Sequence, residues 1–373
     1  LTPPSKNPHQ FRFSLAELLS DYIPPSLTSQ ISSATTYQHN LDKQLTQINR
    51  PDGTQINFDY GSNSGLLNKI QTPRGNFLFN YQPNSNLVSS LISPDNEVLR
   101  YQYVGNILTQ VKTEGTINST IQYAFNNDAT LSQINILGGV NIPLSYDRDN
   151  LLIKIANLNF TRNSVGEINA SVLNQVSEKI SFDEFGQISE NKFQDKKNTL
   201  YFTKFYRDNL GRLVSVVKEH NNKQLEQYQY DKQARLTSVF QNSKLERLYK
   251  YDQNGNRTEA QYQGHRVLAQ YDAQDRLIKY GQTEYQYNSN GDLITKIEHS
   301  KNDDKDDDDK VHHQSTRITH YNFDVFGNLR SVQLPNGKNI EYIIDSQNRR
   351  IGKKVNGKLY QGFIYQSQTQ VAA

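Results

Sequence analysis

Aromatic and polar residues alternate in short stretches that recur along the chain. Examples are YQY at 228–230, YKY at 249–251 and YQY at 285–287. Alternation with a period of two is typical of a β-strand that carries aromatic side chains on one face and polar side chains on the other. The pattern therefore predicts many short strands rather than helices.

Each of these stretches leads into Asp or Asn, then residues typical of turns, and then Leu or Ile. An Asp side chain accepts hydrogen bonds from backbone N–H groups two or three residues on, and Gly supplies positive φ without steric cost. We therefore expect the chain to reverse after each aromatic anchor, so that one copy folds as a β-hairpin. The clearest copies are YDRDNLL at 146–152, FDEFGQI at 182–188, YDKQARL at 230–236, YDQNGNR at 251–257, YDAQDRL at 271–277, YNSNGDL at 287–293 and FDVFGNL at 323–329, and a degenerate copy lies at Ile344 and Asp345.

Successive anchors lie mostly 20 to 24 residues apart, a period that fits one small supersecondary element. A second regularity follows the turn, in which Leu precedes Val or Ile by three residues, as in Leu213 with Val216 and Leu236 with Val239. We expect the leucine to pack under the turn and to be followed by a bulge and the returning strand. The predicted fold class is all-β, a tandem series of hairpins in a long antiparallel sheet that curves or spirals.

The candidate site residues are the anchors, caps and glycines of these turns, and their expected role is structural. They are Gly211, Arg212, Tyr230, Asp231, Tyr251, Asp252, Gly255, Tyr271, Asp272, Phe323, Asp324 and Gly327.

Two segments depart from the repeats. Residues 1–30 contain five prolines, which do not fit central strands, so we expect an N-terminal connector there and the repeat array over 31–373. An acidic loop at about 300–314 contains KNDDKDDDDK, a run that like-charge repulsion keeps extended. Three interpretations stay open for it: a hairpin-tip loop, a natural or introduced protease or tag sequence resembling an enteropeptidase site, and a metal site in the form of a loose calcium loop. Separately, His312 and His313, which follow the run, could bind a metal adventitiously with Asp308 or Asp309.

Composition narrows the class of protein. Hydrophobic residues make up 35% of the chain and aromatic residues 10%, with 23 Tyr and a net charge of +3. This is too little apolar material for one large core, and too little charge to indicate a nucleic-acid or membrane-surface partner. The longest apolar stretches are too short to span a bilayer. Because the chain begins with LTPPSKNPHQ and contains no Met, we expect an internal piece of a longer polypeptide.

Catalytic motifs are not found. The chain has no Cys, which excludes thiolate nucleophiles and thiolate metal sites. It also contains no Gly-x-Ser-x-Gly, His-Glu-x-x-His or Walker sequence, the usual signatures of hydrolases, metalloproteases and NTPases. The sequence therefore predicts no enzyme, no cofactor and no metal.

The repeats resemble those of YD-repeat proteins, which include bacterial Rhs elements, insecticidal toxin complex subunits and teneurins. The resemblance covers roughly residues 1–365 and rests on the signature Tyr-x-Tyr-Asp-x-x-Gly-Arg-Leu, present here as YQYDKQARL, YKYDQNGNR and KFYRDNLGRL. It implies a hollow β-shell, or part of one, that in toxins encloses a variable C-terminal effector.

Two functions follow from this resemblance as expectations. The first is a structural shell segment of a bacterial, secreted or cell-surface Rhs-type protein, with a toxin payload outside this chain or other parts of the same shell as its partner. The alternative is an adhesion module that binds cell-surface glycans or proteins, because rows of exposed tyrosines also suit sugars.

Overall fold

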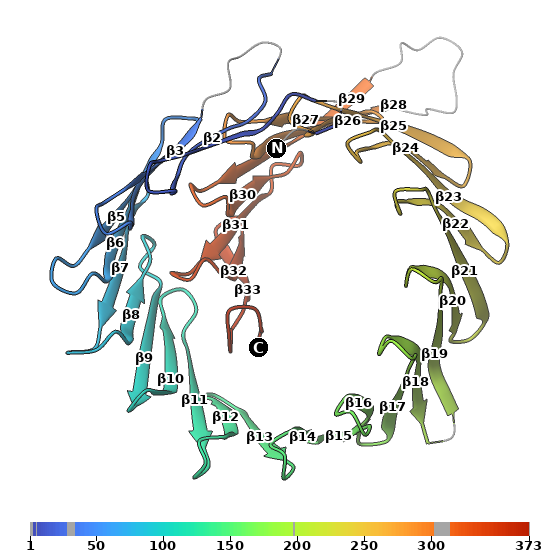
Figure 1. Cartoon of the computed structure of the whole chain (residues 1–373), viewed down its shortest axis with the longest axis horizontal. Coiled ribbons are helices and arrows are strands. Elements are labelled where there is room, and N and C mark those ends of the chain that lie inside the picture. Colours follow the sequence, from blue (N-terminus) through green and yellow to red (C-terminus); the bar gives the residue numbers. More distant parts are fainter. Residues whose placement is uncertain (1–2, 5, 28–33, 197, 302–313, 373) are drawn as a thin grey trace. The chain divides into compact units, whose positions relative to one another are not determined.

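The computed structural model describes residues 3–4, 6–27, 34–196, 198–301 and 314–372. These residues form 33 β-strands and no α-helix, and consecutive strands pair antiparallel within each compact part of the chain. The predicted all-β class is confirmed (Figure 1). No described segment forms a helix long and apolar enough to cross a membrane.

Unit 1 is one of two compact parts of the chain, and it combines residues 1–122 with residues 269–373. The first of its segments carries β1 (Gln10–Phe13), β2 (Leu19–Ile23), β3 (Thr35–His39), β4 (Leu45–Asn49), β5 (Gln55–Tyr60), β6 (Leu67–Thr72), β7 (Gly75–Tyr81), β8 (Val88–Ile92), β9 (Val98–Val104), β10 (Ile107–Glu114) and most of β11 (Ser119–Phe125). The second carries β26 (Leu277–Tyr280), β27 (Thr283–Tyr287), β28 (Leu293–Lys301), β29 (Gln314–Phe323), β30 (Leu329–Gln333), β31 (Asn339–Ile344), β32 (Arg350–Val355) and β33 (Lys358–Gly362).

Unit 2 covers residues 123–268. It contains β12 (Leu131–Ile136), β13 (Val140–Tyr146), β14 (Leu152–Ile155), β15 (Leu158–Arg162), β16 (Ile168–Leu173), β17 (Val176–Phe182), β18 (Ile188–Asp195), β19 (Asn198–Arg207), β20 (Leu213–Glu219), β21 (Lys223–Tyr230), β22 (Leu236–Gln241), β23 (Lys244–Tyr251) and β24 (Arg257–Tyr262). Strand β25 (His265–Tyr271) crosses the boundary back to unit 1.

The two ends of each hairpin use different turns. In the copy at 230–236, Asp231 N–H donates to the Arg235 carbonyl (3.0 Å), and Ala234 N–H donates to the Asp231 carbonyl (3.1 Å). Ala234 has a φ of 61°, the left-handed conformation that completes a type I turn in a three-residue hairpin loop. At the opposite end, Asn242 and Ser243 both have positive φ (49° and 69°), as a two-residue type I′ turn requires.

A bulge follows the leucine, as the pattern predicts. Tyr230 pairs with Leu236 and Gln229 pairs with Ser238, which leaves Thr237 without a partner residue on the opposite strand. The extra residue places the leucine and the residue three positions later on one face of the returning strand.

The leucines themselves are half-buried, and their packing under the turns stays a prediction. Leu213 and Leu329 both keep partial solvent contact. The residues three positions later, Val216 and Val332, are the buried ones, at 3% and 7% exposure. The apolar positions nearest the sheet centre therefore supply the core, because the turns lie at the edge.

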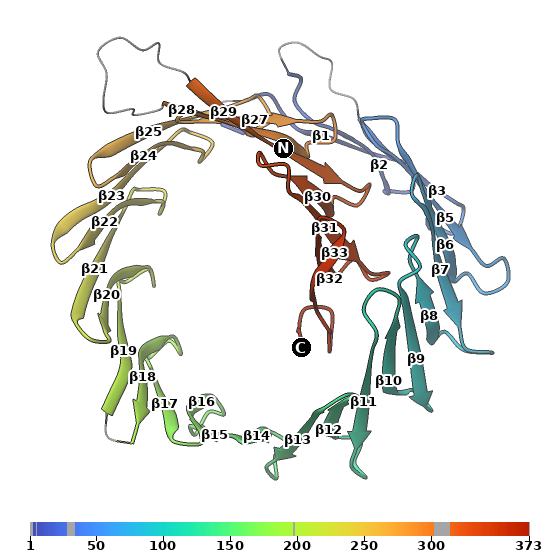
Figure 2. The ribbon, with the colours of Figure 1, turned by 180° about the vertical axis from the view of Figure 1, so that it is seen from behind.

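Most of the core lies in unit 1. Its buried apolar side chains come from both segments, for example Leu99 of β9 and Ile351 of β32. Strands β30–β33 lie alongside β5–β9 in two opposite views (Figure 1 and Figure 2). Phe77 and Phe326 join the two segments with ring centroids 5.5 Å apart at an interplanar angle of 76°. Unit 1 is therefore two-layered where its segments meet.

Strands also form before residue 30. Strand β1 pairs with β2, which pairs with β3, and the five prolines of 1–30 all lie outside β1 and β2. The division of the chain at residue 30 stays a prediction. Most of the acidic run, with His312 and His313, lies outside the described residues, so its three interpretations stay open.

Candidate functional site

The Asp turn at 230–236 binds its own backbone and the arginine four residues after the Asp. Asp231 Oδ1 accepts the N–H groups of Gln233 and Arg235, both at 2.9 Å, and its Oδ2 accepts Arg235 Nε at 2.7 Å. Partial burial opposes ionisation, but the hydrogen bonds from Arg235 and Gln233 hold the pKa of the Asp231 carboxyl below its ordinary value. The carboxylate therefore stays charged and fixes the arginine over the turn.

The same arginine reaches the next repeat. Arg235 Nη1 donates to the carbonyl of Asp252 at 2.7 Å, and its guanidinium lies 4.8 Å from the ring centroid of Tyr251. The Tyr251 hydroxyl donates back to the carbonyl of Leu236 at 2.7 Å. Adjacent turns are thus joined by a cation–π contact and two hydrogen bonds, which explains the Arg of the signature and the Tyr that precedes its Asp.

The other predicted turn residues occupy equivalent positions. Arg212 pairs with Asp208 and lies 4.9 Å from the ring of Tyr230, whose hydroxyl donates to the Leu213 carbonyl. Gly211, Gly255 and Gly327 have φ values of 75°, 91° and 81° at the left-handed turn position. Tyr271 and Phe323 end β25 and β29, opposite Leu277 and Leu329. These residues do not form one site, because they are distributed in series along both units.

One turn prediction concerns Asp252, whose Oδ1 accepts the N–H of Asn256 at 2.9 Å. Replacing Asp252 with Ala should lower the free energy of unfolding by about 1 kcal/mol, because a backbone-capping acceptor is lost. Denaturant titration followed by tyrosine fluorescence measures this, since the chain has no Trp. An unchanged midpoint would contradict a capping role for the repeat Asp.

The hydrogen bonds of the tyrosine hydroxyls predict that the protein loses stability at alkaline pH. Tyr60, Tyr81 and Tyr103 each donate to a carbonyl of the preceding repeat, at 2.9, 2.9 and 3.1 Å, and burial raises the pKa of all three. A tyrosinate cannot donate, so this stabilisation is complete below the ordinary pKa of about 10 and is lost as pH rises through the raised value. The urea midpoint should hold from pH 7 to 9 and fall above about 10. Tyrosinate absorbance should appear together with loss of β-sheet circular dichroism. Ionisation of the tyrosines at their ordinary pKa, with an unchanged circular dichroism spectrum, would contradict a stabilising role for these hydroxyl hydrogen bonds.

A seam of polar contacts joins the two segments of unit 1. We define the seam as Lys6, Asp52, Arg74, Phe77 and Asp95 of the first segment with Asp272, Asn290, Asp324, Phe326 and Arg330 of the second. The contacts run in the same order along both segments: Lys6 Nζ donates to the Asp272 carbonyl (2.6 Å), and Asn290 Nδ2 donates to Asp52 Oδ2 (2.7 Å). Turns of the second segment therefore dock successively on turns of the first.

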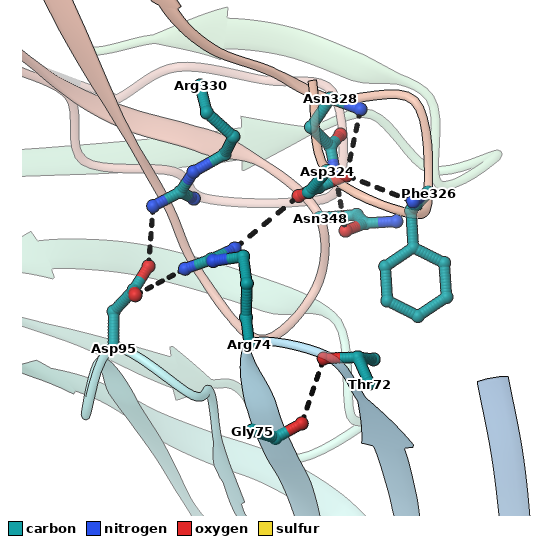
Figure 3. Close-up of polar contacts among 9 residues, drawn as sticks. All are labelled: Thr72, Arg74, Gly75, Asp95, Asp324, Phe326, Asn328, Arg330 and Asn348. Atoms are coloured by element: carbon teal, nitrogen blue, oxygen red, sulfur yellow. Dashed lines mark hydrogen bonds and ion pairs between the residues drawn. The ribbon is translucent and has the colours of Figure 1, made fainter. Parts of the chain in front are cut away.

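The centre of the seam is a four-residue ion-pair chain (Figure 3). Asp95 lies between two guanidinium groups: it contacts Arg74 through Oδ1 and accepts Arg330 Nη2 through Oδ2 at 2.7 Å. Arg74 Nη1 also lies 3.6 Å from Asp324 Oδ2, and the Asp324 side chain is only 3% exposed. Burial opposes ionisation of Asp95, but Arg74 and Arg330 hold the pKa of its carboxyl below the ordinary value.

Asp324 connects the turn chemistry to the seam. Its Oδ1 caps the N–H groups of Phe326 and Asn328, both at 3.0 Å, as expected for a repeat Asp. The hydroxyl of Thr72 donates to the Gly75 carbonyl (2.8 Å) and closes the tight turn that presents Arg74. Sequence reasoning identified Asp324 but missed Arg74, Asp95 and Arg330, because no local pattern distinguishes them from other exposed charges.

A polar cleft of about 580 Å³ adjoins the seam. One wall is a row of directly paired residues across β29–β32: Asn322, Ser331, Glu341 and Lys354. The buried Glu97 lies on the other wall, and both of its carboxylate oxygens accept the Thr116 N–H at 3.1 Å. The described residues contain no group of three or more His, Asp or Glu suited to a metal. The charges of the cleft suit docking between the two segments of unit 1.

Solved structures with a similar fold contain TcdB2 and TccC3. The crystal structure of TcdB2-TccC3-Cdc42 superposes on 94% of this chain with a TM-score of 0.66 at 12% identity, and that of TcdB2-TccC3-TEV on 97% with a TM-score of 0.64, also at 12% identity. This chain covers 22% and 25% of those chains.

Sequence comparison finds teneurins. Teneurin-1 of Gallus gallus is 23% identical over 345 residues, which cover 88% of this chain and 11% of that protein. Teneurin-3 of Mus musculus is 21% identical over 292 residues, covering 74% of this chain and 10% of that protein. The chain thus spans about a tenth of the curated relatives. The model of the teneurin YD-shell matches residues 1–373. The chain therefore belongs to the teneurin YD-shell family, which confirms the resemblance carried by its repeats.

Proposed function

We propose that this chain is a wall segment of a β-shell that sequesters a payload carried by the same polypeptide. The observation that carries the proposal is the seam, because a wall that retains cargo must resist opening between its layers. In the seam, Asp95 is held by Arg74 and Arg330, and Phe77 packs on Phe326. Family membership and the toxin-complex fold support a structural shell role.

The partner in this proposal is a C-terminal toxin payload, or other parts of the same shell, in a bacterial protein that is secreted or held at the cell surface. The chain itself would catalyse nothing. Its contribution would be exclusion: the paired, antiparallel backbone leaves few openings for a protease, and the turn arginines link each repeat to its neighbour.

The test uses limited proteolysis of the full-length polypeptide carrying a protease-sensitive tag at its C-terminus. The tag should resist cleavage in the wild type and become sensitive when the seam is broken by Asp95→Asn together with Arg330→Gln. The control is Glu114→Gln together with Arg100→Gln, which removes the same two charges from a more exposed pair in the same segment. Circular dichroism verifies that each variant is folded. A tag that is cleaved equally fast in the wild type and in the seam variant would refute sequestration.

A further inference from the structure

Four turns of unit 1 dock through the same turn position. Each has five residues, in which the first N–H donates to the fifth carbonyl and the fourth N–H donates to the first carbonyl. These turns begin at residues 50, 93, 288 and 324, and their third residues are Asp52, Asp95, Asn290 and Phe326. All four third residues contact the other segment of unit 1, three through polar contacts and Phe326 through the ring of Phe77. The third residue is therefore the docking position of a repeat turn.

Unit 2 places apolar side chains at this docking position in three successive turns. The turns join β15 to β16, β17 to β18 and β19 to β20, and their third residues are Val165, Phe185 and Leu210. These side chains are 77%, 80% and 76% exposed. The docking positions of the turns on either side are polar, with Asp149 before and Gln233 after. We call the three residues the apolar ladder, because they form a bounded series rather than scattered exposure.

Strand pairing spaces the apolar ladder evenly. Strands β15–β20 pair antiparallel in sequence, and the three turns close alternate strand pairs, so they lie at the same edge of the sheet. Neighbouring strands lie about 4.8 Å apart, which sets successive members of the ladder about 10 Å apart and gives it a length of about 20 Å. A second surface with the same spacing would remove all three side chains from water together.

The fifth residues of the same three turns change in charge along the ladder. They are Glu167, Gln187 and Arg212, which run from negative through neutral to positive. Asn163 Nδ2 donates to Glu167 Oε2 at 2.8 Å, and Arg212 Nε donates to Asp208 Oδ2 at 2.7 Å, so both side chains are held at the turns. The Arg212 side chain is shared with Asp208 and still keeps 30% exposure. The two ends of the ladder therefore differ in charge.

We propose that the apolar ladder joins two copies of this chain in an antiparallel contact with two-fold symmetry. In this arrangement Phe185 meets Phe185 of the other copy at the axis, and Val165 faces Leu210 of the other copy. The same rotation sets Glu167 opposite Arg212 at both ends, so the edge is complementary to itself, as an isologous interface requires.

A second copy is favoured over other partners by two observations. In unit 1, turns of this chain already dock on turns of this chain through the same position, as Asp52 does with Asn290. A partner with a uniformly acidic or basic surface would match the charge at only one end of the ladder. The proposal goes beyond the shell role and does not depend on it, because all residues of the ladder lie in unit 2.

The first experiment is sedimentation velocity of the intact chain. Three turn tips cover less than the about 800 Å² per partner of a standard interface, so the contact should be weak. We expect a monomer–dimer equilibrium between about 1 µM and about 1 mM. Phe185→Ser should raise the dissociation constant at least tenfold. The matched control is Gln233→Ser, which changes the docking position of a turn outside the ladder and should leave the constant unchanged.

The second experiment tests the symmetry by disulfide cross-linking, which the absence of Cys from the chain makes specific. Under mild oxidation Phe185→Cys should cross-link to itself, because the residue lies at the axis. Val165→Cys and Leu210→Cys should each stay uncross-linked alone and should form a mixed disulfide when the two proteins are combined. Gln233→Cys is the control for random collision of exposed thiols.

Three results would overturn the proposal. The first is a monomer over the whole concentration range, and the second is a dimer that Phe185→Ser leaves unchanged. The third is a Val165→Cys protein that cross-links to itself as fast as the Phe185→Cys protein, which would exclude the antiparallel arrangement. Circular dichroism of each variant verifies that a folded protein was measured, and the high exposure of all three side chains means that the fold should tolerate these changes.

Discussion

Replacing Asp345 with Asn should destabilise unit 1 by about 3–5 kcal/mol, because it leaves the Arg349 guanidinium buried without its counter-charge. Asp345 is fully buried and Arg349 is 8% exposed. Asp345 Oδ2 accepts Arg349 Nε at 2.8 Å, and its Oδ1 accepts the N–H groups of Gln347 and Arg349, both at 2.9 Å. Urea titration monitored by tyrosine fluorescence measures the loss.

The matched control is Asp231→Asn, which makes the same substitution in the equivalent turn of another repeat, where the side chain is more exposed. Asp231 and Arg235 repeat the contacts of Asp345 and Arg349 almost distance for distance, but their side chains keep 21% and 27% exposure. Water can solvate the unpaired arginine there, so the loss should be clearly smaller. Equal losses at the two turns would show that local hydrogen bonding, rather than burial of the charge, sets the stability of a repeat turn.

The second large effect is expected at Leu99 in β9. Its side chain is fully buried, and its strand partners are Leu91 of β8 and Thr113 of β10. Leu99→Ala should cost about 2–5 kcal/mol, because the packed strands around it can close the resulting cavity only in part. The measurement is the same urea titration, with Leu359→Ala as control, since Leu359 lies on the edge strand β33 with 49% exposure. A small loss at Leu99 would mean that the two-layered part of unit 1 relaxes to fill the space.

The strands, turns and bulges could be predicted because the residues that determine them lie within a single repeat. Alternation sets which face a side chain occupies, and Asp231 and Gly211 show turn chemistry that acts within five residues. The bulge at Thr237 follows from the same short-range pattern. These features need no knowledge of distant residues, so sequence periodicity was sufficient to find them.

The seam could not be predicted, because its contacts join residues far apart in the chain. Asp52 and Asn290 are 238 positions apart, and Arg330 and Asp95 are 235 apart. Each of these residues, taken locally, is an ordinary turn or strand charge. The burial of the degenerate copy was not predicted either. Ile344 and Asp345 carry the weakest form of the signature, yet they form a buried turn, because the Ser367 carbonyl and the Tyr365 ring cover Arg349.

The contacts between adjacent turns restrict which insertions and deletions the repeat array can accept. A tyrosine such as Tyr251 binds the carbonyl of Leu236 in the repeat before it, and Arg235 binds the Asp252 carbonyl in the repeat after it. A duplicated hairpin brings both halves of these contacts, whereas an added single strand would reverse the direction of every later strand and move the later Asp turns to the opposite edge of the sheet. Insertions and deletions should therefore survive only as whole hairpins. Within unit 1 even those would shift the docking partners of the seam, which makes residues 123–268 the part of the chain best able to vary in copy number.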